Sequence, residues 1–168
     1  MTDTQSFPRA LRHVLRQNPD VIVIGEMRDM ETMATALTAA ETGHLVLATV
    51  HASGVTQTLK RIAGVYEGDA QRQVLLQLAH SLQGIISQDW LFPKKGARRV
   101  LAYELLVANS AARNLIRENN LHLMDSLLQT AGKEGMVTLE QCLSDLCAQG
   151  KITHDVAVSR APHPELLG

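Results

Sequence analysis

Two short apolar segments joined by an alanine-rich stretch constrain the fold of this 168-residue chain more than any other feature. Residues 21–24 and 44–50 are rich in valine, isoleucine and leucine, as buried parallel strands are. Between them, residues 30–42 favour a helix that ends at Gly43, a residue suited to the C′ position. A helical crossover of this kind joins parallel strands, almost always in the right-handed sense. The sequence therefore predicts a β-α-β unit whose two strand ends lie at one edge of a central parallel sheet.

The rest of the chain shows weaker patterns of secondary structure. A helix is predicted after Ser6, a plausible N-cap, and Pro19 ends its pattern. Thr138 and Gln141 have the spacing of a capping box at the start of an amphipathic helix. The remaining predicted elements are helices over residues 55–65 and 69–90, a turn at 93–96, a strand over 99–107, and short helices beyond residue 110.

Composition excludes several classes of protein. The chain is 45% hydrophobic and 20% charged, which is ordinary for a folded globular protein. Its net charge of −1 and its aromatic content of 3% argue against a nucleic-acid partner. No apolar run approaches the roughly 18 residues of a transmembrane helix. Cys142 and Cys147 have neither metal-ligand nor disulfide-framework spacing. Because the sequence shows neither a signal peptide nor an apolar run of that length, a reducing, cytosolic location is expected.

Polar side chains follow both predicted strands. Glu26 comes directly after the first strand, where P-loop NTPases carry their second acidic motif beside magnesium and water. Thr49 and His51 end the second strand, and an imidazole at that edge could donate to a terminal phosphate or sense its loss. An alternative is that Glu26, Arg28 and Asp29 are solvated turn residues, with Asp29 capping the next helix. His51 could likewise be a purely structural histidine.

A metal hydrolase that uses Glu26, His44 and His51 is a third possibility. These residues lack an H-x-x-x-H pair and an evident third ligand, which argues against it. His44 also begins its strand, so it should point away from the edge that Glu26 reaches.

Several segments resemble the bacterial secretion and type IV pilus ATPase superfamily. Residues 15–29 match its pattern L-R-x-x-P-D-x-hydrophobic-G-E-x-R-D without a gap. Residues 37–44 and 49–51 are similar to its histidine box, and residues 81–88 to the helix that follows. Residues 111–118 differ at one position from the A-I-R-N-L-I-R-E motif of the pilus-retraction branch.

The resemblance implies roles for the residues at the two strand ends. Glu26 matches the Walker B glutamate, which helps to hold Mg²⁺ indirectly and to order the attacking water. His51 matches the histidine that senses the terminal phosphate of ATP. Gly25, Arg28 and Thr49 are the implied nucleotide-binding residues beside them.

The resemblance also implies a retraction motif. From composition alone the same segment could be an ordinary solvated helix with arginines spaced for surface ion pairs. The chain has no four-cysteine cluster, which argues against the pilus-extension and type II secretion branches. The motif residues are Ala111, Arg113, Asn114, Leu115, Ile116, Arg117 and Glu118.

The implied fold is α/β: the C-terminal half of a RecA-like P-loop NTPase domain, with parallel strands and crossover helices, followed by a small helical subdomain. Residues 1–107 would form the partial ATPase core and residues 108–161 the helical subdomain. Residues 162–168, which contain two prolines, would form a flexible tail.

Departures from the family pattern qualify this expectation. The sequence contains no G-x-x-x-x-G-K-[ST] phosphate-binding loop. The family's upstream aspartate box and N-terminal sensor-like domain are also missing, and Ala52-Ser53 replaces the usual Thr-Asn after the histidine. We therefore expect a C-terminal fragment that lacks full ATPase activity by itself, with Met1 as either an artificial boundary or the native start of a truncated gene.

For the intact protein, the resemblance implies a hexameric ATP-hydrolysing motor that powers type IV pilus retraction. It would use ATP and Mg²⁺, contact a platform protein of the inner membrane, and lie in the cytoplasm or peripherally at that membrane. The alternative is a non-catalytic assembly or regulatory subunit that docks onto a complete ATPase ring. A truncated parallel sheet would favour docking because it leaves an unpaired strand edge and an uncovered apolar face.

Overall fold

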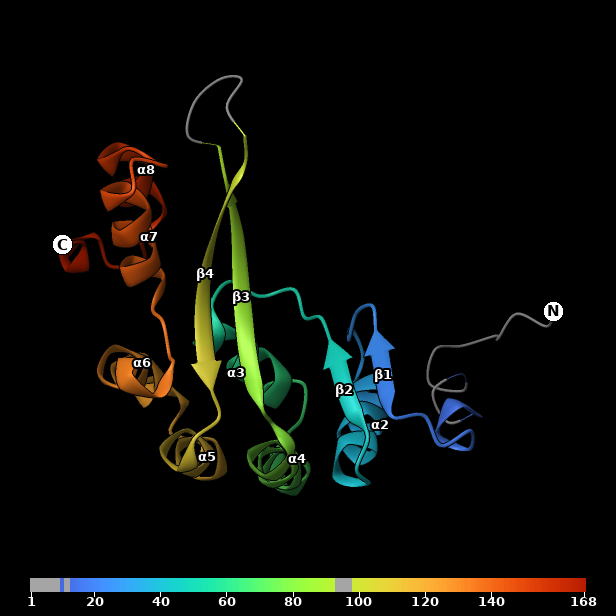
Figure 1. Ribbon diagram of the computed structural model, residues 1–168. Coiled ribbons are helices and arrows are strands. Elements are labelled where there is room, and N and C mark those ends of the chain that lie inside the picture. Colours follow the sequence, from blue (N-terminus) through green and yellow to red (C-terminus); the bar gives the residue numbers. More distant parts are fainter. Residues whose placement is uncertain (1–9, 11–12, 93–97) are drawn as a thin grey trace.

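The computed structural model describes residue 10 and residues 13–92 and 98–168. Within these residues the strands form two separate pairs, the parallel pair β1-β2 and the antiparallel pair β3-β4 (Figure 1). Helices lie behind and below the strands, and the C-terminal helices lie beside the hairpin. The elements are β1 (Val21–Ile24), α2 (Met30–Glu41), β2 (Leu45–Ala48), α3 (Val55–Ala63), α4 (Gly68–Ser81), β3 (Gly84–Leu91), β4 (Val100–Val107), α5 (Ser110–Arg117), η1 (Leu121–Leu123), α6 (Met124–Thr130), η2 (Gly132–Glu134), α7 (Leu139–Ala148), α8 (His154–Arg160) and η3 (Pro164–Leu166).

The predicted β-α-β unit is confirmed. β1 and β2 pair in parallel with Val21 opposite Leu45. α2 begins where the Asp29 carboxylate accepts a hydrogen bond from the backbone N–H of Thr32 at 2.8 Å, so Asp29 is the helix cap that the sequence suggested. α2 gives way to β2 through Gly43, whose φ of +99° lies in the region that only glycine adopts readily.

The expectation of buried central strands is wrong for this pair. In the part of the chain that the structure describes, the sheet contains only β1 and β2, so each strand has one unpaired edge. One face packs on α2 through the buried side chains of Ile22 and Ile24. The other face is open, and its apolar side chains are 48–72% exposed. The uncovered apolar face predicted for a truncated sheet is thus present: Val21 48%, Val23 72%, Leu45 50% and Leu47 52%.

The helix predicted over residues 69–90 is also wrong in its second half. α4 ends at Ser81, and residues 84–91 form strand β3, which pairs with all of β4 from Gly84 opposite Val107 to Leu91 opposite Val100. The burial of β3 alternates along the strand, as a hairpin with one covered face requires. A side chain at Gly84 would place its Cβ 2.8 Å from the Leu106 carbonyl oxygen, so glycine permits the close start of this pairing. The strand predicted over residues 99–107 is confirmed as β4.

The buried hydrophobic residues form two main clusters, one at each end of the β3-β4 hairpin. The larger cluster joins α2, α3, α4, α5 and α6 around the end of β4, with Leu59, Leu106 and Ile116 fully buried at its centre. The smaller cluster packs α7 and α8 against the other end of the hairpin through Leu91 and Leu143. The hairpin therefore connects the helices that follow β2 with the C-terminal helices.

The C-terminal region consists of short helices, as predicted. Thr138 caps α7 by accepting the backbone N–H of Gln141 at 3.1 Å. The chain then continues through α8 to η3, and the N–H of Gly168 donates to Ser144. The domain boundaries and the flexible tail stay predictions. The predicted cap at Ser6 and the predicted turn at 93–96 lie outside the described residues. Of the helix predicted after Ser6, the described residues Ala10 and 13–15 are helical.

None of the helices in the described ranges combines the length and the apolar character needed to cross a membrane.

Candidate functional site

The register of β1 and β2 determines which side chains meet at the end of the sheet. Ile24 and Ala48 are paired, and they are the last residues of their strands. Two further backbone hydrogen bonds continue the pairing, from Thr49 N to the Ile24 carbonyl at 3.3 Å and from Met27 N to the Thr49 carbonyl at 3.0 Å. The two chains therefore leave the sheet side by side.

Glu26 is the centre of the resulting site. Its carboxylate contacts Nη2 of Arg28 at 2.5 Å through Oε2 and Nε2 of His51 at 3.3 Å through Oε1. The Glu26 side chain is 21% exposed, whereas those of Arg28 and His51 are 75% and 78% exposed. Nearby, the Thr49 hydroxyl donates to the Gly25 carbonyl. The structure thus brings together all five residues that the sequence placed at this edge, while their roles stay predictions.

The electrostatics favour an ionised Glu26. Its hydrogen bond with Arg28 is the largest influence and lowers the pKa of the carboxyl group, while partial burial acts in the opposite direction. The charges of Arg28, His51 and Arg61 lower the pKa further. Glu26 is therefore a charged hydrogen-bond acceptor at neutral pH.

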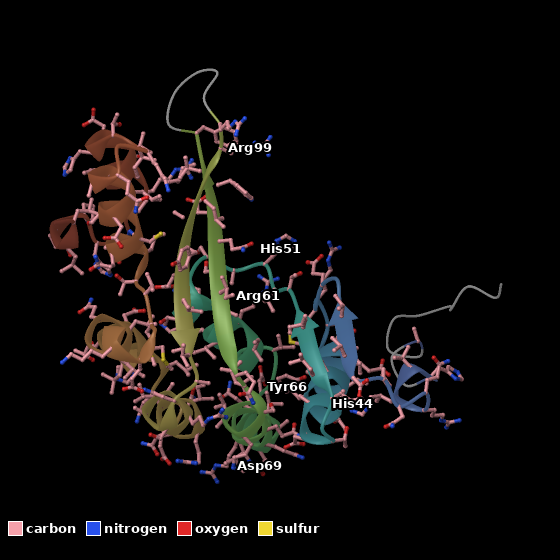
Figure 2. The ribbon with its side chains drawn as sticks, viewed as in Figure 1. His44, His51, Arg61, Tyr66, Asp69 and Arg99 are labelled. Atoms are coloured by element: carbon pink, nitrogen blue, oxygen red, sulfur yellow. The ribbon has the colours of Figure 1, made fainter. Side chains whose placement is uncertain are left out.

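An open cavity of about 760 Å³ begins at His51 and runs along α3. Besides His51 and Ala52 it is lined by the polar side chains of Ser53, Gln57, Lys60 and Arg61. Figure 2 shows His51 and Arg61 in the middle of the molecule, between β2 and the hairpin. None of these four polar residues was predicted from the sequence. The available signal was the helical spacing of positions 57, 60 and 61, which places their side chains on one exposed face of α3.

The site has no closed cage of protein ligands for a metal, but Glu26 would suit a hydrated Mg²⁺ that it contacts through water. Among the described residues, no group of three or more His, Cys, Asp or Glu side chains is placed to hold a metal. Mg²⁺ usually keeps several waters and uses only one or two carboxylates together with substrate phosphates. The ionised and accessible carboxylate of Glu26 meets that requirement.

Comparison with known proteins identifies the family. A family model described as "Type II/IV secretion system protein" matches residues 2–94. The chain belongs to this type II/IV secretion family. It is 46% identical over 163 residues to the "Type IV pilus retractation ATPase PilT" of Pseudomonas aeruginosa, covering 97% of this chain and 47% of the relative. It is also 47% identical over 164 residues to the "Twitching motility protein" of Neisseria gonorrhoeae, covering 98% of this chain and 44% of the relative.

A solved structure gives the same result. The "Crystal Structure of the Pilus Retraction Motor PilT and Bound ADP" matches with a TM-score of 0.86 and 51% identity, over 97% of this chain and 46% of that chain. The predicted fold class, part of an α/β secretion-ATPase domain with parallel strands and crossover helices, is confirmed. The chain spans about half the length of the curated relatives it matches.

The predicted retraction motif lies on a different part of the fold from the site. Its residues fall on α5 and the residue after it, and α5 lies below the β3-β4 hairpin, away from the ends of β1 and β2 (Figure 1). Ala112 and Ile116 are fully buried. The Arg113 guanidinium donates to the carbonyls of Ala79 and His80, at 2.8 and 2.9 Å, at the C-terminal end of α4. The motif thus has a clear packing role, and a specific role in retraction stays a prediction.

His44 also stays outside the site of this secretion-family chain. Its Nδ1 is 3.0 Å from the Ala39 carbonyl and 3.2 Å from the Thr42 hydroxyl, in the turn between α2 and β2. The sequence-based expectation that His44 points away from Glu26 agrees with these contacts.

Removing Arg28 should raise the pKa of Glu26 toward its ordinary value. The titration of Glu26 can be followed by the NMR chemical shift of its carboxyl carbon as the pH is lowered. We expect the titration midpoint to rise in Arg28→Ala, because that variant loses the strongest stabilising contact of the carboxylate. His51→Ala should cause a smaller rise because the charge of His51 ranks below the Arg28 contact. An unchanged midpoint in Arg28→Ala would contradict this account of the site.

Proposed function

We propose that this chain is part of a motor ATPase that powers type IV pilus retraction. The observation that carries the proposal is the placement of Glu26, bound by Arg28 and His51, at the shared end of two parallel strands. The identity to proteins named for pilus retraction and twitching motility supports the same conclusion.

The proposed chemistry is the hydrolysis of ATP with Mg²⁺. Phosphoryl transfer depends mostly on positioning and on stabilising charge. An ionised Glu26 would accept a hydrogen bond from the attacking water and help to hold the hydrated Mg²⁺. His51 would donate a hydrogen bond to a terminal phosphate oxygen. When that phosphate leaves, His51 would contact Glu26 instead. Gly25, Arg28 and Thr49 would shape the adjoining nucleotide site.

The intact protein would work as an assembly. We propose a hexameric ring, cytoplasmic or peripheral at the inner membrane, that transmits its motion to a platform protein there. Residues 1–107 would contribute to the ATPase core and residues 108–161 would form its helical subdomain. This chain has no G-x-x-x-x-G-K-[ST] sequence to cradle the phosphates, so we expect it to turn over ATP poorly on its own.

The proposal can be tested by a chimera. The region of the P. aeruginosa relative that aligns with this chain, 47% of its length, would be replaced by this chain. In a strain that lacks the relative, the chimera should restore twitching motility. A stable, ring-forming chimera that gives no twitching would contradict the proposed function.

A second function, a docking subunit without catalysis, is favoured by the open face of the β1-β2 sheet. Its exposed apolar side chains would bind a surface of a complete ATPase ring, as an exposed apolar patch usually does. Size measurement of the chain with and without the full-length relative would distinguish the functions. Stable co-migration of chain and ring, with no gain of ATPase activity, would favour the docking subunit.

A further inference from the structure

We propose that Glu104 is a positioning residue for His51, because its carboxylate on β4 fixes the first turn of α3 and thereby the loop that carries the histidine. The relevance of this contact to hydrolysis rests on the proposed function. The contact itself follows from the described geometry and can be tested without nucleotide.

The start of α3 has no cap of its own. Gly54 occupies the N-cap position and offers no side chain to the backbone N–H groups of the first turn, which lack partners within the helix. The φ of Gly54 is +87°, a conformation that other residues rarely adopt. A Cβ at this position would also lie 3.2 Å from Oε2 of Glu104. Glycine therefore lets the carboxylate approach the helix end.

Side chains from three other elements supply the missing contacts. Glu104 on β4 accepts the backbone N–H of Val55 at 2.5 Å. Ser87 on β3 accepts the backbone N–H of Gly54 at 3.0 Å. In addition, the hydroxyl of Thr56 donates to Asp125 on α6 at 2.5 Å. The first turn of α3 is thus held by both strands of the hairpin and by a helix of the C-terminal region.

Glu104 lies in a partly desolvated and acidic environment. It is half-buried, and burial raises the pKa of its carboxyl group, while the Val55 N–H bond lowers it and the charges of Asp125 and Glu140 raise it. A carboxylate at a helix N-terminus is also favoured by the helix dipole. A half-buried carboxylate near other acids is costly unless a specific contact compensates, and the hydrogen bond from the N–H of Val55 is such a contact.

The short connection to His51 makes this cap relevant to the site. Only Ala52 and Ser53 separate His51 from Gly54, and each residue extends the chain by at most about 3.3–3.6 Å. The Ala52 N–H further donates to the Val50 carbonyl at 3.1 Å, which tightens the loop. A displacement of β4 that keeps the Glu104 cap should therefore shift the loop that carries His51.

The test is the contact between His51 and Glu26 in this chain, measured as the nuclear Overhauser effect between the imidazole protons and the Glu26 side chain. Glu104→Ala should lose this contact, because the N–H of Val55 loses its partner. Glu104→Gln should retain it, because the amide oxygen can still accept that N–H. Thr138→Ala is the matched control, since it removes the cap of α7 and should leave the His51 contact unchanged.

Two results would overturn the proposal. One is an undiminished contact in folded Glu104→Ala, and the other is an equal loss in Thr138→Ala, which would indicate a general effect of lowered stability. If Glu104→Ala does not fold, Ser87→Ala replaces it, and an unchanged contact in that variant would count against the proposal. The measurement requires no ATP, so an inactive chimera with this coupling intact would refute only the proposed function.

Discussion

Replacing Glu26 by Gln should lower the ATPase rate of the chimera by about 10²–10⁴-fold, the range for losing a general acid or base. Gln keeps the size of the side chain but removes the charge that Arg28 and His51 bind. It would orient the attacking water less well and could not take up its proton. The measurement is kcat for ATP hydrolysis with Mg²⁺, together with twitching motility, which should be lost.

A suitable control is Glu67→Gln. Glu67 is an exposed glutamate at the start of α4, where its side chain makes no capping hydrogen bond. The control chimera should hydrolyse ATP and support twitching as the parent chimera does. If Glu26→Gln kept most of the parent rate, Glu26 would not be the catalytic carboxylate that accepts the proton of the water, and the solvated-turn interpretation would be preferred.

The placement of this site could be predicted from local sequence. Two apolar runs and a helix between them determine a parallel pair, and a parallel pair puts Glu26 and His51 at one edge. The Asp29 cap was predictable for the same reason, because an N-cap depends on the residue itself and its next few neighbours.

The errors arose where long-range pairing overrides local pattern. Residues 84–91 continue the polar and apolar spacing of α4, but they pair with residues 100–107 of β4, and no local signal in the sequence indicates this register. The role of Glu104 was equally hidden, because its contact with Val55 joins residues far apart in the sequence. A glycine at the start of α3 was the one available hint that another element supplies the cap.

Ile116→Ala should lower the free energy of unfolding by about 2–5 kcal/mol, the usual cost of truncating a buried aliphatic side chain to alanine. Ile116 is fully buried in the cluster that joins the α3-α4 region to α5 and α6. The loss combines reduced apolar burial with a cavity that the surrounding helices fill only in part. Urea denaturation of this chain would measure it as a lower midpoint with an unchanged slope.

Asn114→Ala provides the comparison within the same motif. Asn114 is exposed, and its side chain accepts a surface hydrogen bond from Arg117, so its loss should change the unfolding free energy by no more than about 0.5 kcal/mol. In the chimera, a folded Asn114→Ala that abolished twitching would then indicate a surface role in retraction, separate from the packing role of Ile116. If the two variants lowered the free energy of unfolding equally, the burial of Ile116 would not be the reason that the motif stabilises the fold.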